Sequence, residues 1–437
     1  MTAETPLRQA PRCVALTTPA WPRGASPNGI VTYTAELAAA LRERGARPII
    51  LSWRVEKGAK TLGSASALEE DVLDISEYEP ERTLVNRVWA KARRARRFDS
   101  VVETRFRMIE QAMEAAAKRF PIEVLEIEEA FGIAMPVIAA GRVPVVVRLH
   151  GPWFLNGRAL GVKEDAAFER RDRLEREAIA RADAVTAPSR DVLERTRSHY
   201  RLPLENARVV YPPVDSSAVG AAWDLADCDR NRLAFIGRFD RHKGGDLMID
   251  AFATLARTRP QLTLDFVGPD RGILDQSTGT IHLEEYLASR VPDAEIRRRI
   301  VLHGQQTSAV IDDLRRRALV TVVPSRYETF GYTAVEALTL GCPVVAANVG
   351  GLAETVRDQQ TGLLFDAGDA RSLANQISKF LEMPEWAARL GAAARKDVAL
   401  RFAPRSIAEQ TLETYAAVLE GRRDRATRPA QRPKANA

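Results

Sequence analysis

The chain has 437 residues, of which 45% are hydrophobic, and it carries 64 Lys and Arg against 58 Asp and Glu, a formal net charge of +6. This length is enough for two or three domains that each bury a core, and the hydrophobic content excludes a disordered chain. The positive excess lies in two segments, 85–98 and 421–437, and the rest of the chain is mildly acidic. Because no aromatic-interleaved basic groove or known nucleic-acid module accompanies these segments, we expect no nucleic-acid binding.

The three cysteines, Cys13, Cys228 and Cys342, are far apart and form no CxxC pair. Neither a disulfide framework nor a cysteine-based zinc site is indicated, which fits a reducing compartment. The first residues lack the apolar stretch of a signal peptide, and no apolar run is long enough to cross a bilayer. We therefore expect a cytoplasmic protein.

Short runs rich in β-branched residues alternate with helical stretches along the chain. Such runs, unbroken by polar alternation, are typical of strands in parallel sheets that helices cover on both faces. The sequence therefore predicts an α/β architecture. The predicted strands are 13–17, 48–52, 122–127, 144–149, 184–187, 208–211, 233–237, 262–268, 300–304, 319–323 and 343–347.

A domain boundary is predicted after Tyr211, where Pro212 and Pro213 interrupt regular structure before a new strand begins at Leu233. Ligands of open parallel sheets bind beyond the carboxyl ends of the strands, so we expect the site in a cleft between the two domains. The predicted division is a first domain (1–215), a second domain (216–400), a C-terminal helix that crosses back to the first domain (401–420) and a disordered basic tail (421–437).

Gly29 precedes a predicted helix in which Ile30, Thr34, Leu37 and Leu41 keep helical spacing. A glycine at a helix N-terminus lets a ligand approach the backbone N–H groups and the positive end of the helix dipole. The dinucleotide fingerprint GxGxxG is absent, which argues against a nicotinamide-binding domain. A flexible strand-to-helix loop would have the same sequence.

Arg238 and Lys243 lie in a predicted strand-to-helix loop that ends in Gly244 and Gly245. Two cations at the carboxyl end of a parallel strand, beside a glycine-rich helix start, are suited to bind a diphosphate. The loop is not a P-loop, because GxxxxGK[ST] is absent. The alternative is a solvated basic loop without a ligand.

Glu328 lies just before a predicted helix over 329–340, and Glu336 follows on roughly the same side of that helix, about two turns along. Carboxylates accept hydrogen bonds from sugar hydroxyls, and the N–H groups of Phe330 and Gly331 at the helix start would face an anion. This arrangement suits a nucleotide sugar. Two surface glutamates, one of them capping the helix, would explain the same pattern.

The stretch PSRYETFG, the EX7E pair Glu328 and Glu336, and the following GCPVVAANVGGLAE together resemble the signature of retaining glycosyltransferases of family 4. The stretch GRFDRHKG, which contains Arg238 and Lys243, resembles the diphosphate-binding loop of that family. EX7E alone is a weak pattern, but the combination in this order is specific. The resemblance is strong over 233–380, fair over 13–52 and 144–200, and absent in the tail.

The resemblance implies the GT-B fold, with two Rossmann-like domains that face each other across a cleft. The first domain would lie on the acceptor side and the second would bind the nucleotide sugar. Arg238 and Lys243 would hold the donor diphosphate and neutralise the charge that develops as it leaves. Glu328 would bind hydroxyls of the transferred sugar, and Glu336 would bind the ribose.

The same resemblance assigns backbone roles to Phe330 and Gly331, whose N–H groups would cover the distal phosphate, and to Gly29, which would let the first-domain loop close over the donor. His150 matches a position where the family often has a histidine near the reacting sugar, although a strand-end histidine needs no such role. The sequence also departs from the family pattern. The family often has two glycines where this chain has Asn28-Gly29, the stretch 269–299 is longer than usual, and 53–120 matches nothing in the family.

Residues 85–98 include six Arg and Lys residues and no acid, with Val85, Val88, Trp89 and Ala92 on one side at helical spacing. A helix of this kind could lie on an anionic membrane surface, where the enzyme would meet a lipid-linked acceptor. A solvated helix packed on its own domain explains the pattern equally well.

Taken together, we expect a retaining glycosyltransferase, cytoplasmic or peripheral at the inner face of the membrane, that transfers a hexose from a nucleotide diphosphate sugar to a hydroxyl acceptor. A role in cell-surface glycan or glycolipid synthesis would fit. We expect no cofactor and no metal, because no convincing HExxH, DxD-centred or His/Cys site is present. The alternatives are a GT-B-like sugar-nucleotide epimerase or hydrolase and a non-catalytic sugar-nucleotide-binding protein.

Overall fold

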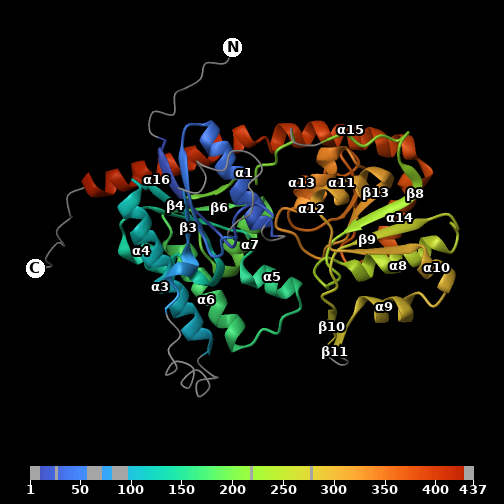
Figure 1. Ribbon diagram of the computed structural model, residues 1–437, viewed down its shortest axis with the longest axis horizontal. Helices are drawn as coiled ribbons and strands as arrows, with labels where there is room; N and C mark the ends of the chain where they lie inside the picture. The colour runs from blue at the N-terminus through green and yellow to red at the C-terminus, as the bar shows by residue number, and fades with distance from the viewer. Residues whose placement is uncertain are drawn as a thin grey trace, which may run out of the picture.

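The computed structural model describes residues 10–24, 28–56, 71–80, 97–216, 220–275 and 279–427. Figure 1 shows two bodies side by side, each built on a parallel sheet. The strand orders are β3-β2-β1-β4-β5-β6-β7 and β12-β9-β8-β13-β14-β15. In each sheet the order reverses beside its first strand, β1 or β8, and such a switch point is where open α/β sheets bind ligands.

The first domain combines the seven-stranded sheet with helices on both faces. Its strands β1, β4, β5 and β6 are buried at every residue, including the charged residues Glu126 and Glu128 of β4 and Arg148 of β5. Burial on both faces is typical of a parallel sheet covered by helices. The strands are β1 (Cys13–Thr18), β2 (Arg47–Ser52), β3 (Val72–Asp74), β4 (Val124–Glu128), β5 (Val145–Arg148), β6 (Ala184–Ala187) and β7 (Ala207–Val209). The helices are α1 (Gly29–Glu43), η1 (Ile75–Tyr78), α3 (Arg97–Arg119), η3 (Ala130–Gly132), α4 (Met135–Ala140), α5 (Trp153–Ala159), α6 (Ala166–Arg181) and α7 (Arg190–Tyr200).

The second domain has the six-stranded sheet and a separate antiparallel pair, β10–β11. Its strands are β8 (Asp229–Ile236), β9 (Thr263–Val267), β10 (Ile273–Asp275), β11 (Gly279–Ile281), β12 (Ile300–Gly304), β13 (Ala318–Val323), β14 (Val344–Ala347) and β15 (Leu363–Phe365). Its helices are α8 (Gly245–Ala256), α9 (Leu283–Arg290), α10 (Ala294–Arg298), α11 (Ser308–Arg317), α12 (Tyr332–Leu340), α13 (Leu352–Thr355), α14 (Ala370–Glu382) and α15 (Pro384–Arg401).

The last helix, α16 (Pro404–Thr427), leaves the second domain and lies on the first, as the red ribbon along the top of Figure 1 shows. Its apolar residues join the core cluster under α1, and Tyr415 donates a hydrogen bond to the buried carboxylate of Glu126 on β4, at 2.9 Å. The helix continues past Gly421, where the sequence predicts a disordered tail to begin. Arg422 explains the difference for 421–427, because its guanidinium contacts Asp183 of the first domain at 3.3 Å.

The α/β fold class with two parallel sheets is confirmed, and each predicted run overlaps a strand of the structure. The connection after Tyr211 differs from a simple polar linker. Val214 donates its backbone N–H to Phe402 at 2.9 Å, and the indole of Trp223 is buried in the second core, donating to Ala318 at 2.8 Å. Strand β8 begins at Asp229, before the predicted start at Leu233, because Asp229 pairs with Ala318 of β13.

Most of the basic segment 85–98 lies outside the described residues, so the predicted membrane contact stays a prediction. Within the described ranges, no helix is both long and apolar enough to cross a membrane.

Candidate functional site

The loops after β8 and β13 meet beside the switch point of the second sheet and bring Lys243 onto Glu328. The ammonium nitrogen of Lys243 lies 2.5 Å from Glu328 Oε1, and Ser325 Oγ donates to the same oxygen at 2.9 Å. Burial alone would raise the pKa of Glu328, but the charges of Lys243 and His242 and the hydrogen bonds outweigh it and hold this pKa below its ordinary value. Glu328 is therefore an ionised acceptor at neutral pH.

The second cation, Arg238, lies in the same loop and donates from Nε to Asp240 at 2.6 Å. Asp240 also accepts the backbone N–H of Lys243 at 2.7 Å, so one carboxylate orients both cationic residues. The loop packs tightly against the Glu328 loop at Gly244, whose φ is +68° and where a Cβ would lie 2.0 Å from the carbonyl oxygen of Pro324. The side chain of Arg238 is 39% exposed, which leaves it accessible to an anion.

Helix α12 begins directly after the predicted phosphate-facing residues Phe330 and Gly331. Gly331 has φ +88°, and a Cβ there would lie 2.5 Å from Leu352, so only glycine fits. The ring of Phe330 is buried against Phe402 and Tyr332. Among the described residues, the backbone N–H groups of Phe330 and Gly331 find no hydrogen-bond acceptor. Free N–H groups at a helix N-terminus are a suitable site for a phosphate oxygen.

Glu336 lies on α12 and is half exposed, but its described contact is with a residue that the sequence analysis missed. Arg315 of α11 donates from Nη2 to Glu336 Oε2 at 2.8 Å and to the carbonyl oxygen of Thr333 at 3.2 Å. The side chain of Arg315 is 1% exposed. A buried guanidinium therefore fixes the carboxylate that is predicted to bind the ribose. The only sequence signal for Arg315 is its place in a run of three consecutive arginines, which is common on surfaces.

The first-domain loop predicted to close over the donor does lie against the second domain. Asn28 caps α1 by accepting the N–H of Ile30 at 2.9 Å, and a Cβ on Gly29 would lie 3.3 Å from Cδ2 of Tyr332, the first residue of α12. The N-termini of α1 and α12 are thus neighbours across the cleft. The single glycine in this loop is enough for the close approach that the structure has.

His150 follows β5 and contacts first-domain residues. Its backbone N–H donates to Glu129 Oε2 at 3.0 Å, and its ring meets Tyr33 edge to face with the centroids 5.0 Å apart. Burial and the positive charge of Arg148 hold the pKa of His150 well below its ordinary value. The imidazole is therefore neutral at pH 7 and able to accept or donate a hydrogen bond.

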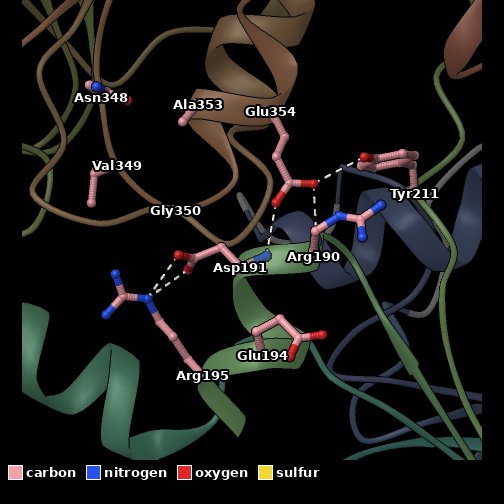
Figure 2. A pocket seen from close by; sticks show the side chains of 10 residues that line it. All are labelled: Arg190, Asp191, Glu194, Arg195, Tyr211, Asn348, Val349, Gly350, Ala353 and Glu354. Atoms are coloured by element: carbon pink, nitrogen blue, oxygen red, sulfur yellow. Dashed lines mark hydrogen bonds and ion pairs between the residues drawn. The ribbon is translucent and has the colours of Figure 1, made fainter. Parts of the chain in front are cut away.

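A hollow of about 620 Å³ between the domains contains none of the predicted site residues. Figure 2 shows Glu354 of α13 directed at the N-terminus of α7 in the other domain. Its carboxylate accepts the backbone N–H groups of Arg190 at 3.0 Å and Asp191 at 2.8 Å and the hydroxyl of Tyr211 at 3.0 Å. A second contact across the gap joins Tyr327, next to Glu328, to the carboxylate of Asp191 at 2.9 Å. Sequence reasoning missed these contacts, because each partner looks like an ordinary surface residue.

Comparison with known proteins gives the family. A model described as "Glycosyltransferase Family 4" matches residues 27–218, and one described as "Glycosyl transferases group 1" matches residues 225–397. The chain belongs to glycosyltransferase family 4. The family membership predicted from the EX7E stretch is therefore confirmed, and residues 219–224, between the two parallel sheets, separate the two matches.

Two relatives of this family 4 protein carry the name D-inositol 3-phosphate glycosyltransferase. That of Thermobifida fusca is 32% identical over 266 residues, which are 59% of this chain and 61% of the relative. That of Nocardiopsis dassonvillei is 31% identical over 291 residues, 64% of this chain and 67% of the relative. The match thus spans less than two thirds of the first relative's length.

Solved structures show that the family 4 protein has the GT-B fold. Sucrose-phosphate synthase of Thermosynechococcus elongatus superposes with a TM-score of 0.70 at 22% identity, covering 94% of this chain and all of that one. HepE of Anabaena, in a complex with UDP-glucose, superposes with a TM-score of 0.62 at 18% identity, covering 93% of this chain and 99% of that one. At these identities the likeness concerns the fold.

The described residues of the family 4 protein contain no cluster of three or more His, Cys, Asp or Glu side chains suited to hold a metal ion. The positive charge at the site comes from Arg238 and Lys243. The geometry thus presents two cations, two free N–H groups and an ionised carboxylate at one end of the second sheet, and a neutral histidine on the first domain.

Proposed function

We propose that this family 4 protein is a retaining hexosyltransferase that transfers a sugar from a nucleotide diphosphate sugar to a hydroxyl acceptor. The observation that carries the proposal is the contact of Lys243 with Glu328 beside the free N–H groups at the start of α12. It joins a cation and anion-binding amides for the diphosphate to a carboxylate for the sugar, where the loops after β8 and β13 meet. Arg238 supplies a second, accessible cation.

In the proposed reaction, the bond from the anomeric carbon to the diphosphate oxygen breaks and a bond from the acceptor oxygen to the same carbon forms. The products are the glycoside, the nucleoside diphosphate and a proton from the acceptor hydroxyl. Negative charge grows on the leaving oxygen, and Arg238, Lys243 and the N-terminus of α12 stabilise it. Asp240 already orients Arg238 and Lys243, and Gly331 sets the backbone at the start of α12. Little reorganisation of these groups is therefore needed when the negative charge develops.

Recognition of the donor divides between the loop before α12 and the middle of that helix. Glu328 accepts hydrogen bonds from hydroxyls of the transferred sugar, and Glu336, held by Arg315, accepts those of the ribose. Gly29 lies against Tyr332 and closes the first-domain side of the donor site. The neutral ring of His150 contacts the reacting sugar from the acceptor side. These roles extend the family pattern to the residues of this chain.

The acceptor is proposed to be a hydroxyl compound used in cell-surface glycan or glycolipid synthesis, with the protein in the cytoplasm or at the inner membrane face. The names of the relatives favour a polyol phosphate as the first acceptor to try, and the HepE complex favours UDP-glucose as the first donor. A basic segment at 85–98 would suit an acceptor anchored in an anionic membrane.

The test begins with thermal unfolding of the purified protein in the presence of UDP-, GDP- and ADP-hexoses. A donor that binds only the folded state, at a concentration 100 times its Kd, raises the free energy of unfolding by about 2.7 kcal/mol. The stabilising donor is then incubated with inositol phosphate and other hydroxyl acceptors, and the products are separated by mass spectrometry. Transfer that is lost in Glu328→Gln and kept in the exposed control Lys396→Met supports the proposal.

The other outcomes separate the alternatives. Donor consumption without any acceptor indicates a hydrolase or epimerase, because those reactions need no second sugar-accepting hydroxyl. Donor binding without consumption, over a broad acceptor panel, indicates a non-catalytic sugar-nucleotide-binding protein. An inverted anomeric configuration in the product, read from its NMR coupling constants, would contradict the retaining mechanism.

A further inference from the structure

The loop that carries His150 is held by a carboxylate that the mechanism above does not use. Glu129, directly after β4, accepts the backbone N–H of His150 at 3.0 Å and that of Gly151 at 2.8 Å, one with each carboxylate oxygen. Gly151 has φ +149°, and a Cβ there would lie 2.2 Å from the side chain of Asn156, so the loop has a conformation open only to glycine.

A second buried carboxylate, that of Glu175 on α6, holds both the loop after β4 and the loop after β5. It accepts the backbone N–H of Trp153 at 2.6 Å, after β5, and that of Phe131 at 3.2 Å, after β4. Phe131 has φ +57°, a left-handed conformation that is uncommon for a bulky residue. Arg171 donates to Glu175 at 2.8 Å, and its guanidinium is stacked 3.9 Å from the rings of both Phe131 and Trp153.

Stability alone does not account for this pair of carboxylates. Glu129 is 2% exposed and Glu175 is fully buried, and the two lie close enough to repel each other. Burial and this repulsion raise the pKa of Glu129 to about 7. Packed apolar side chains in place of buried charges are often neutral or stabilising. Backbone strain of this kind is typical of functional sites, where the surrounding structure must hold a loop in one conformation. The two loops also follow the carboxyl ends of parallel strands, where such folds bind their ligands.

We propose that Glu129 and Glu175 are positioning residues for transfer: together they fix the loops after β4 and β5 so that His150 faces the reacting sugar in a single orientation. The inference rests on the proposed function, in which His150 contacts that sugar. It goes beyond that function, because neither glutamate is among the residues proposed to bind the donor, and both contact backbone N–H groups of the first domain. Glu129 acts on His150 by accepting the backbone N–H of His150 itself. Glu175 acts indirectly, by accepting N–H groups of the loop after β4 and the loop after β5.

The first experiment compares Glu129→Gln with Glu128→Gln. Glutamine keeps the shape of glutamate but replaces one acceptor oxygen with a donor, so Glu129→Gln loses one of its two backbone hydrogen bonds. Glu128 is a matched control, because it is one residue earlier, 5% exposed and bonded to the side chains of Thr17 and Trp53 rather than to a site loop. We expect kcat to fall at least tenfold in Glu129→Gln, with the donor Kd within twofold of wild type, and to change little in Glu128→Gln.

A second readout does not depend on turnover. Hydrogen–deuterium exchange followed by mass spectrometry measures how firmly the amides of 149–153 are held. We expect these amides to exchange at least tenfold faster in Glu129→Gln and in Glu175→Gln than in wild type, and at the wild-type rate in Glu128→Gln. If Glu129→Gln does not fold, Glu175→Gln gives the same comparison through Trp153 and Phe131.

Two results would overturn the inference: a kcat loss in Glu129→Gln no larger than that in the control, or unchanged exchange over 149–153 in both variants. Failure of the proposed function looks different. In that case the wild-type protein itself makes no glycoside, while the exchange experiment still reports whether the two carboxylates hold the loops.

Discussion

Replacing Lys243 with methionine would leave Glu328 as a buried carboxylate without its ammonium partner. The Glu328 side chain is 11% exposed, and its remaining described hydrogen bond is the one from Ser325 Oγ at 2.9 Å. Removing one partner of a buried ion pair typically costs about 3–5 kcal/mol. Because the Lys243 side chain is itself 20% exposed and the Ser325 bond persists, we expect a lower cost here, about 2–3 kcal/mol. For a domain of this size the melting temperature should fall by about 5–10 °C.

Removing both charges separates stability from activity. The double variant Lys243→Met/Glu328→Gln has no unpaired buried charge, so it should recover most of the stability lost in Lys243→Met. Its transfer activity should stay lost, since the leaving diphosphate still lacks its cation, and one such group is worth about 100- to 1,000-fold in kcat. Differential scanning calorimetry and a donor-turnover assay on the same preparations measure the two effects.

Lys396→Met serves as the control, because Lys396 is an exposed lysine of the same domain. The reasoning is refuted if Lys243→Met has the same melting temperature as the wild type, or if the double variant is no more stable than Lys243→Met. Either result would mean that the close contact with Glu328 does not pair charges in solution.

Three further predictions concern the rest of the site. Arg238→Ala should raise the donor KM about tenfold and leave the melting temperature nearly unchanged, because the side chain is 39% exposed; steady-state kinetics and a melting curve check both. Gly331→Ala should lower the free energy of unfolding by about 1–3 kcal/mol in urea titrations, since φ is +88° and the new Cβ would meet Leu352. The pKa of Glu328 is lowered on folding, so its contribution to stability is present above about pH 4.5 and is lost as the pH falls through the lower folded-state value. Urea titrations at pH 7 and pH 4 should therefore show a smaller acid loss in Glu328→Gln than in wild type, and an equal loss would contradict this assignment.

The sequence predicts that Arg238, Lys243 and Glu328, the residues proposed to bind the donor, lie together, because each follows a strand of the same sheet. Arg238 and Lys243 come after one strand and Glu328 after another, and neighbouring parallel strands bring such loops together. The sequence does not predict the direct contact between Lys243 and Glu328. This contact depends on the close packing of Gly244 against the backbone carbonyl of Pro324.

The contacts that escaped prediction join residues from different elements or domains whose sequences show no sign of pairing. Glu354 caps a helix of the other domain, and Arg315 is buried although three consecutive arginines at the end of α11 look like a solvated surface. The buried Trp223 likewise lies in a stretch whose polar composition predicts a linker. In each case the partner is set by tertiary packing, which local pattern and composition do not contain.

The return of α16 to the first domain has a consequence for synthesis. The apolar face of α1, with Leu37 and Leu41, shares one core cluster with Leu412 and Tyr415, which are near the end of the chain. During synthesis the first domain therefore leaves the ribosome long before α16 is made. Until α16 follows, this apolar face of α1 is exposed to solvent. A fragment that ends at residue 215 should accordingly aggregate, and adding α16 as a separate peptide should keep it in solution.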